Sequence, residues 1–183
     1  MKQLCGAVLL VLLTITAFPQ GHKPPSPGQS VVYFTRWSNF QPRIKFDYFD
    51  GEKVIGSFGG LQYLRYECKP GKHLFWASSA NKDFVEAELK ADSTYVIMVE
   101  PVAGPGIPQL KLVPAHPKYK MLYKARWFIV HAPSAFPDSA AIENETKRMS
   151  NFISKSLKEY AEQKPITPTV LKSEMAIPAH RLR

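Results

Sequence analysis

The chain has 183 residues, of which 45% are hydrophobic and 12% aromatic. This composition excludes a disordered chain, and the length suits one domain with a core of its own. The formal net charge of +9 at neutral pH favours contact with anionic surfaces, without naming a partner.

Residues 1–20 have the pattern of a secretory signal peptide. Lys2 precedes the apolar run LCGAVLLVLLTITAF, which falls short of the roughly 20 apolar residues that a spanning helix needs. We expect cleavage between Ala17 and Gly21, with an uncleaved anchor as the alternative. Residues 21–29 are rich in proline and are predicted to be an extended linker. The protein is therefore expected to be exported, to the periplasm or outside the cell, with no transmembrane helix after signal removal.

The two cysteines predict neither a lipid anchor nor a disulfide. Cys5 stands at the start of the apolar run, whereas a lipid-modified cysteine would follow it. Removal of the signal leaves Cys68 as the only thiol, and a small buried hydrophobe on a strand is the expected role for it. Core packing must then supply the stability of the domain, which we place at residues 30–164.

The first half of the domain has the alternation and composition of β-strands. Residues 30–37 are rich in β-branched and aromatic side chains, and residues 42–49 alternate apolar with polar. Asp50-Gly51 is a strong hairpin signal, so residues 52–58 are expected to return antiparallel to the preceding strand.

The segment from Lys69 to Pro101 reads as two further strand pairs. Residues 60–68 are predicted to turn at Pro70-Gly71 into a strand at residues 72–78. Residues 83–90 alternate as a half-buried strand, and residues 94–101 are apolar on both faces, which is typical of a central strand. We expect this segment to be scaffold rather than to carry chemistry.

Prolines interrupt the chain after position 99, leaving room for a short strand at residues 109–113. Residues 119–130 then regain strand character, with Tyr123 and Trp127 on a buried face. The cations Lys120, Lys124 and Arg126 point to the other side. Specific nucleic acid recognition needs aromatic rings and cations on one face, so this arrangement favours at most a weak, salt-sensitive contact with a polyanion.

The spacing of the apolar residues changes from that of a strand to that of a helix after residue 138. Apolar residues recur at helical spacing from Ile142 to Tyr160, and Asp138 or Ser139 can cap the helix. We predict one long helix over residues 139–163, packed on the sheets. Residues 165–183 are predicted to be a flexible tail, docked lightly through Val170, Leu171 and Ile177.

No motif predicts catalysis, a cofactor or a metal. The glycines at 56–60 match no phosphate-binding fingerprint. His73, His116 and His131 match no zinc spacing. Glu86 and Glu88 lie on a solvated strand, without the burial that would raise the pKa of one carboxyl group for general acid–base catalysis. An enzyme would need a cleft that brings His73 or His131 beside an acid.

The order of motifs resembles a bacterial envelope family, the domain of unknown function numbered 2846. The resemblance covers residues 30–102. The matching positions are Tyr33, Arg36, Gly51, Gly56, Gly60, Tyr63, the run Pro70-Gly71-Lys72-His73, and Tyr95. The family implies a secreted, PEGA-like β-sandwich and supplies no catalytic residues. Its members commonly look like lipoproteins, from which this chain departs by lacking a cysteine after the signal.

We therefore expect a mainly β protein, an antiparallel β-sandwich of immunoglobulin or prealbumin type with one long C-terminal helix. The expected function is a non-enzymatic envelope module that binds or supports a partner protein. The alternative is a binding protein for carbohydrate or another anionic envelope ligand. The candidate contact residues are Trp37, Trp76, Lys120, Lys124 and Arg126.

Overall fold

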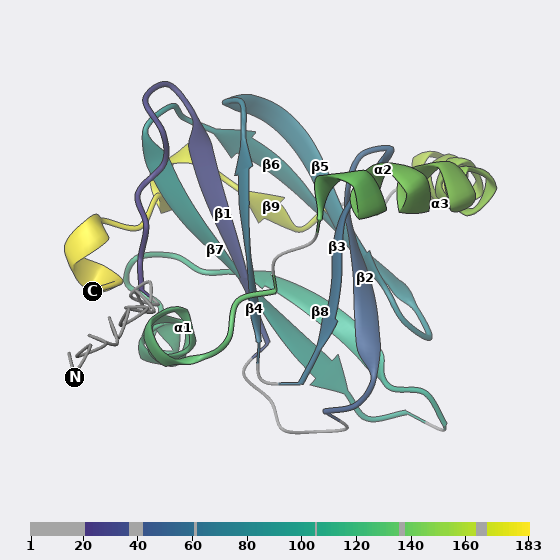
Figure 1. Ribbon diagram of the computed structural model, residues 1–183, viewed down its shortest axis with the longest axis horizontal. Helices are drawn as coiled ribbons and strands as arrows, with labels where there is room; N and C mark the ends of the chain where they lie inside the picture. Colours follow the sequence, from purple (N-terminus) through teal and green to yellow (C-terminus); the bar gives the residue numbers. More distant parts are fainter. Residues whose placement is uncertain (1–20, 37–41, 61, 105, 136–137, 164–167) are drawn as a thin grey trace, which may run out of the picture.

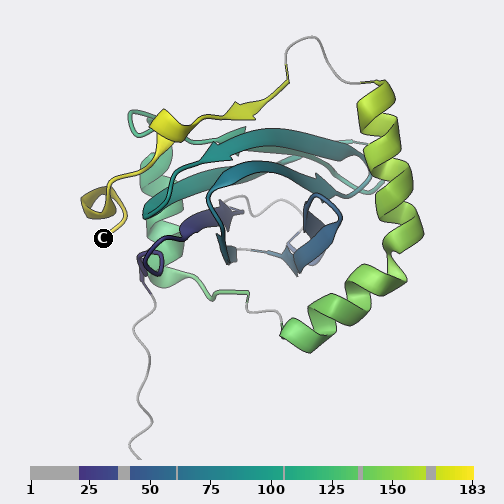
Figure 2. The same cartoon turned by 90° about the horizontal axis from the view of Figure 1, so that it is seen from above.

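The computed structural model describes residues 21–36, 42–60, 62–104, 106–135, 138–163 and 168–183. Two mixed β-sheets pack face to face within these residues, and helices lie against their outer sides, as Figure 1 and, from above, Figure 2 show. The strands of sheet A are, in spatial order, β4 (Tyr63–Cys68), β1 (Ser30–Thr35), β7 (Ser93–Val102) and β8 (Gln109–Pro114). The strands of sheet B are, in spatial order, β3 (Lys53–Gly59), β2 (Lys45–Asp50), β5 (Gly71–Ser78), β6 (Lys82–Leu89) and β9 (Val170–Leu171).

The strands lie close to their predicted positions, but their pairing differs. The β2–β3 hairpin over Gly51 is confirmed, and Gly51 takes the positive φ of 53° that this turn requires. The hairpin expected over Pro70-Gly71 is wrong, because β4 pairs with β1 in sheet A while β5 pairs with β2 and β6 in sheet B. This turn carries the chain from one sheet to the other.

The expectation of a purely antiparallel sandwich is also wrong. β1 pairs parallel with β7, and β6 pairs parallel with the two-residue β9. The central position expected for residues 94–101 is confirmed, since β7 lies between β1 and β8. Alternation shows which face of a strand is buried, but it does not show which strand lies beside it.

The main core lies between the two sheets. It is built from inward side chains of both, including Phe34, Phe75, Val85, Ile97 and Leu112, all fully buried or nearly so. Residues 69–101 supply β5, β6 and β7 to this core. The segment therefore builds part of this core, as its alternation indicates.

The outer face of sheet A is apolar as well, and helix α1 (Leu122–His131) covers it. Val31, Tyr33 and Val96 on this face pack against a helical stripe, and every residue of β1 is buried. The stripe consists of Leu122, Ala125, Phe128, Ile129 and Ala132. The strand predicted for residues 119–130 is thus wrong, because burial of this stripe against β1 and β7 selects the helix.

The outer face of sheet B carries a row of aromatic rings. Phe49, Trp76 and Phe84 are direct cross-strand neighbours on β2, β5 and β6. Phe49 stacks on Trp76 with ring centroids 3.7 Å apart, and Trp76 on Phe84 at 5.4 Å. Tyr160 of α3 (Ser150–Glu162) then stacks on Phe84 at 4.3 Å. Such contacts stabilise beyond their buried area by about 0.5–1.5 kcal/mol each.

The single long C-terminal helix is wrong in one respect: two helices, α2 (Ser139–Arg148) and α3, meet at Met149. The predicted cap is confirmed, since the Asp138 carboxylate accepts the amide of Ala140 at 3.1 Å. Thr146 of α2 accepts the amide of Val54 on β3. The bend lets α2 follow the β3 edge while α3 crosses the outer face of sheet B, as Figure 2 shows.

The C-terminal residues 168–183 pack on the sheets. Leu171, Ile177 and Leu182 are buried, whereas Val170 is 37% exposed. Leu171 belongs to the core between the sheets, and two short 3-10 helices follow at Ser173–Met175 and Ala179–Arg181. The anticipated docking through Leu171 and Ile177 occurs, and Leu182 adds a contact that the sequence did not indicate.

Two side chains of the β5–β6 hairpin bind the free edge of β8 and thereby tie the sheets together. The side-chain amide of Asn81 donates a hydrogen bond to the carbonyl of Leu110 at 2.9 Å. Its Oδ1 accepts a hydrogen bond from the backbone N–H of Leu110 at 2.7 Å. Asp83 accepts the amide of Leu112 at 2.6 Å. These side chains complete backbone hydrogen bonds that an edge strand otherwise leaves open.

Replacement of Asn81 by alanine should destabilise the protein by about 1–3 kcal/mol, because two backbone groups of the buried Leu110 lose their partner. The measurement is urea unfolding at neutral pH. Asn151→Ala, at an exposed position of α3, is the control and should change stability little. Equal stability of the two variants would show that Asn81 does not hold the β8 edge.

Candidate functional site

The outward face of α1 exposes two large aromatic side chains. Tyr123 is 63% exposed and Trp127 is 53% exposed, the former being the highest value among the large hydrophobic residues described. The two lie one helical turn apart, so they share a face. Because the opposite stripe of α1 is buried against sheet A, these rings must point away from the protein.

His131 extends the aromatic row by a further turn. Its imidazole stacks on the indole of Trp127 with centroids 5.1 Å apart, and its Nδ1–H donates to the Trp127 carbonyl at 2.9 Å. Trp127 also meets Phe128 edge to face at 5.1 Å. These contacts fix the orientation of the indole while half of its surface stays in solvent.

Cations flank this aromatic row. Lys120 is exposed just before α1, and Lys124 follows it one turn later. Arg126 is exposed on the other side of the row. We call Lys120, Tyr123, Lys124, Arg126 and Trp127 the α1 face.

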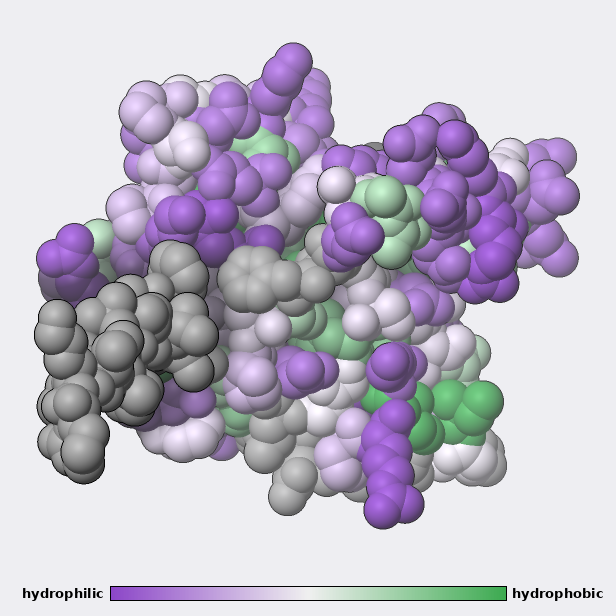
Figure 3. Space-filling model, in the orientation of Figure 1, coloured by the Kyte–Doolittle hydropathy of each residue, from purple (hydrophilic) through white to green (hydrophobic). Residues whose placement is uncertain are grey.

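The charge around the α1 face differs from that on the other helices. Between Glu100 and Asp138 the sequence contains no Asp or Glu. On α2 and α3, by contrast, Lys147 pairs with Glu143 at 2.9 Å, and Lys155 and Lys158 lie 3.9 Å from Glu159 and Glu162. Figure 3 shows the hydrophilic surface over α2 and α3. Cations there stabilise their own helices, whereas acidic residues are missing from the segment that forms the α1 face.

Further cations lie near the start of α1. Arg181 donates to the carbonyl of Pro117 at 3.0 Å, which places the C-terminal end of the chain beside the helix. The pKa of His22 is lowered by burial and then by the nearby charges of Arg183 and Arg65. Burial is the larger cause of this lowered pKa, and the two arginine charges add to it.

The structure separates the candidate contact residues into two groups. Lys120, Lys124 and Arg126 come together on the α1 face. Trp76 does not join them: it is fully buried under α3, and its indole N–H donates to the carbonyl of Gly51 at 2.9 Å. Its expected role as an exposed contact is wrong, because α3 covers the outer face of sheet B. Trp37 lies outside the described residues.

Tyr123 and Trp127 are the site residues that the sequence reading missed. Strand alternation put them on a buried face, opposite the cations, and this was the reason for discounting specific nucleic acid recognition. In the helix they share the exposed side with those cations. The spacing of Leu122, Ala125 and Ile129 is the signal that could have indicated a helix.

A second cluster of titratable groups joins the sheets near the β2–β3 turn. His73 Nδ1 lies 2.8 Å from an oxygen of Asp50, and the same oxygen accepts the hydroxyl of Tyr66 at 3.0 Å. His73 Nε2 lies 2.8 Å from the Lys69 carbonyl. The side chains of His73 and Asp50 are each 14% exposed.

This cluster is built to hold a charged imidazole in place. The hydrogen bond to Asp50, supported by the neighbouring Cys68, raises the pKa of His73 to about 10. Burial, and then the Asp50 carboxylate, raise the pKa of the Tyr66 hydroxyl. Both ring nitrogens of His73 are engaged, so this contact with an acid does not offer a free proton donor or acceptor to a substrate.

Among the described residues, no three His, Cys, Asp or Glu side chains are grouped as metal ligands would be. No helix in the described part of the chain is long and apolar enough to cross a bilayer. Comparison of the sequence with protein-family models and with curated proteins finds no match.

The His73–Asp50 pair should make stability depend on pH. Because the pKa of His73 is raised from 6.5 to about 10 on folding, its contribution is fully present below pH 6.5 and is lost as pH rises towards 10. Urea denaturation gives the free energy of unfolding of each protein. The difference in this free energy between the wild type and His73→Gln should become smaller over this interval.

His180→Gln, at an exposed position, serves as the control and should leave the pH dependence of the wild type unchanged. A difference between wild type and His73→Gln that stays constant from pH 6 to pH 10 would contradict the charged state assigned to His73.

Proposed function

We propose that the protein is an exported, non-enzymatic module of the cell envelope that rests on an anionic membrane surface through the α1 face. The observation that carries the proposal is the exposure of Tyr123 and Trp127 beside the cations of the α1 face, of which Lys120 lies just before the helix and Lys124 and Arg126 lie on it. Tyrosine and tryptophan favour the membrane interface, where the ring meets the acyl boundary and cations meet the headgroups.

The shape and chemistry of the α1 face favour a lipid surface over a glycan. The rings stand on the outside of a helix rather than in a hollow. The segment from residue 101 to 137 lacks the carboxylates that would accept hydrogen bonds from sugar hydroxyls. A layer of anionic headgroups requires neither a hollow nor acceptors, only cations and interfacial aromatic rings.

Export rests on the N-terminal sequence, which has the lysine and the apolar run of a signal peptide. The non-enzymatic assignment rests on His73, which meets an acid but has both ring nitrogens engaged. A membrane-bound module of this kind can hold a partner protein near the surface, which keeps the supporting role expected from the sequence.

Neutralising the cations of the α1 face should strongly weaken binding to anionic vesicles. The triple variant Lys120→Gln, Lys124→Gln, Arg126→Gln removes three cations, each worth about 1 kcal/mol at such a surface. Affinity for phosphatidylglycerol–phosphatidylcholine vesicles should therefore fall by about 100-fold. Co-sedimentation at two salt concentrations measures this, and higher salt should weaken the wild type.

The triple variant Lys147→Gln, Lys155→Gln, Lys158→Gln is the matched control, with the same loss of charge on α2 and α3. It should retain most of the binding, and Trp127→Ala should lose a smaller part than the α1 triple. Equal losses in both triples, or binding to an anionic polysaccharide such as alginate but not to vesicles, would overturn the proposal.

A further inference from the structure

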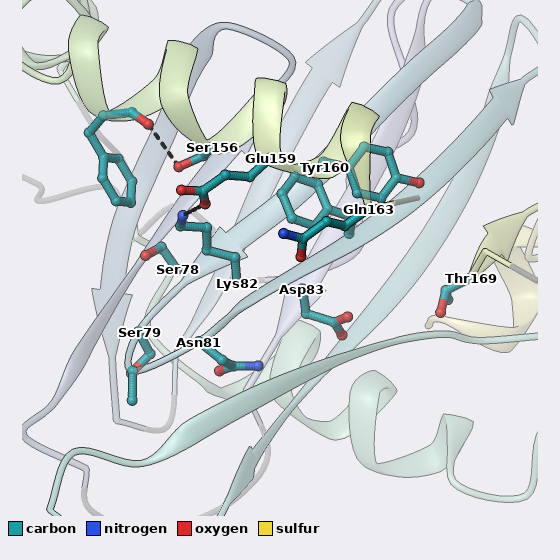
Figure 4. A pocket seen from close by; sticks show the side chains of 13 residues that line it. Ser78, Ser79, Asn81, Lys82, Asp83, Ser156, Glu159, Tyr160, Gln163 and Thr169 are labelled. Carbon is teal, nitrogen blue, oxygen red and sulfur yellow. Dashed lines mark hydrogen bonds and ion pairs between the residues drawn. The ribbon is translucent and has the colours of Figure 1, made fainter. Parts of the chain in front are cut away.

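A groove of about 780 Å³ lies between α3 and the β5–β6 hairpin, on the opposite sheet from α1. Figure 4 shows it from close by, with α3 above and the hairpin below. Its size falls within the range of about 300–1,000 Å³ typical of small-molecule sites. It is lined by Ser78, Ser79, Ala80, Asn81, Lys82, Asp83, Phe84, Phe152, Ser156, Glu159, Tyr160, Gln163 and Thr169.

Three aromatic rings give the groove an apolar wall. Phe84 and Tyr160 form one stacked pair, which continues the row through Trp76 beneath α3. Phe152 contributes a third ring that is 37% exposed and lies 6.0 Å from Trp76. Phe84 is stacked on both Trp76 and Tyr160, so Phe152, the exposed ring of the three, offers the apolar surface to a ligand.

The charged groups of the groove already have hydrogen-bond partners. Lys82 Nζ lies 2.6 Å from the carboxylate of Glu159, bridging the hairpin and α3, and 5.4 Å from the ring of Phe152. Asp83 accepts the Leu112 amide. These groups carry one more negative than positive charge, so the groove does not favour an anion, in contrast to the α1 face.

Hydrogen-bonding capacity remains at the centre. The ammonium of Lys82 has three donors and the Glu159 carboxylate has several acceptor sites, and their side chains are 26% and 41% exposed. Ser78 and Gln163 line the same groove and add a hydroxyl and an amide to it (Figure 4). Donors and acceptors thus stand beside an aromatic wall in a concave site.

We infer that this groove binds a neutral oligosaccharide of β-linked, gluco-configured units. Such sugars combine flat apolar C–H faces, which pack on aromatic rings, with equatorial hydroxyls that both donate and accept hydrogen bonds. A polyanion would need unpaired cations, and an acyl chain would leave the Lys82–Glu159 pair buried without compensation. The inference stands independently of the proposed role of α1.

Chitobiose and cellobiose are the probes, titrated into the purified protein up to millimolar concentration and followed by NMR. We expect at least one of them to bind and to perturb the signals of Phe84, Phe152 and Tyr160. Phe152→Ala should weaken that binding about tenfold, as loss of an aromatic contact of up to about 1.5 kcal/mol predicts. Glu159→Gln should weaken it by a similar factor through loss of a charged acceptor.

Two controls keep structural effects apart from binding. Lys158→Gln changes charge on the exposed side of α3 and should bind the sugar as the wild type does, as should the α1 triple variant. Thermal unfolding should show that Phe152→Ala and Glu159→Gln remain folded at the titration temperature. The inference is overturned if neither disaccharide binds, or if both groove variants bind as tightly as the wild type.

Discussion

Both sheets of this protein carry large apolar side chains on their outer faces as well as on their inner ones, and the rest of the structure follows from that constraint. The inner faces meet to form the main core. The outer face of sheet A, around Tyr33 and Val96, and the row around Trp76 on sheet B each need a separate cover. An antiparallel sandwich with wet outer faces would not bury these residues. The helices meet this requirement, α1 on one side and α3 on the other.

The helices over the two outer faces differ in the chemistry of their exposed sides, which gives the molecule two distinct sides. The exposed lysines of α2 and α3 lie beside glutamates of their own helices, and that side is hydrophilic and locally balanced in charge. α1 instead turns Tyr123 and Trp127 outward among cations. A groove without excess positive charge suits a neutral ligand, whereas a cationic aromatic face suits an anionic surface. The proposed lipid contact and the inferred sugar site therefore divide between the two sides without competing.

Local patterns in the sequence predicted much of the scaffold and little of the site. Asp50-Gly51 identified its hairpin, and the alternation around Val85 identified a half-buried strand, because both are short-range properties. Residues 119–130 satisfied two periods at once: Tyr123, Ala125 and Trp127 alternate, while Leu122, Ala125 and Ile129 follow a helix. Only the apolar outer face of sheet A decides between them, and strand pairing across long sequence separations creates that face. The exposure predicted for Trp76 was wrong for the same reason, because helix α3, which covers it, lies far along the chain.

The account depends most on which side chains of α1 face outward, and cysteine accessibility measures this directly. In a Cys68→Ala background, Tyr123→Cys, Ala125→Cys, Trp127→Cys and Ile129→Cys would each be exposed to a thiol reagent under native conditions. Positions 123 and 127 should react rapidly, whereas positions 125 and 129, which are buried in the structure, should be protected. A strand places all four on one face. Similar reactivity at the four positions would contradict the helix and the functional surface built on it.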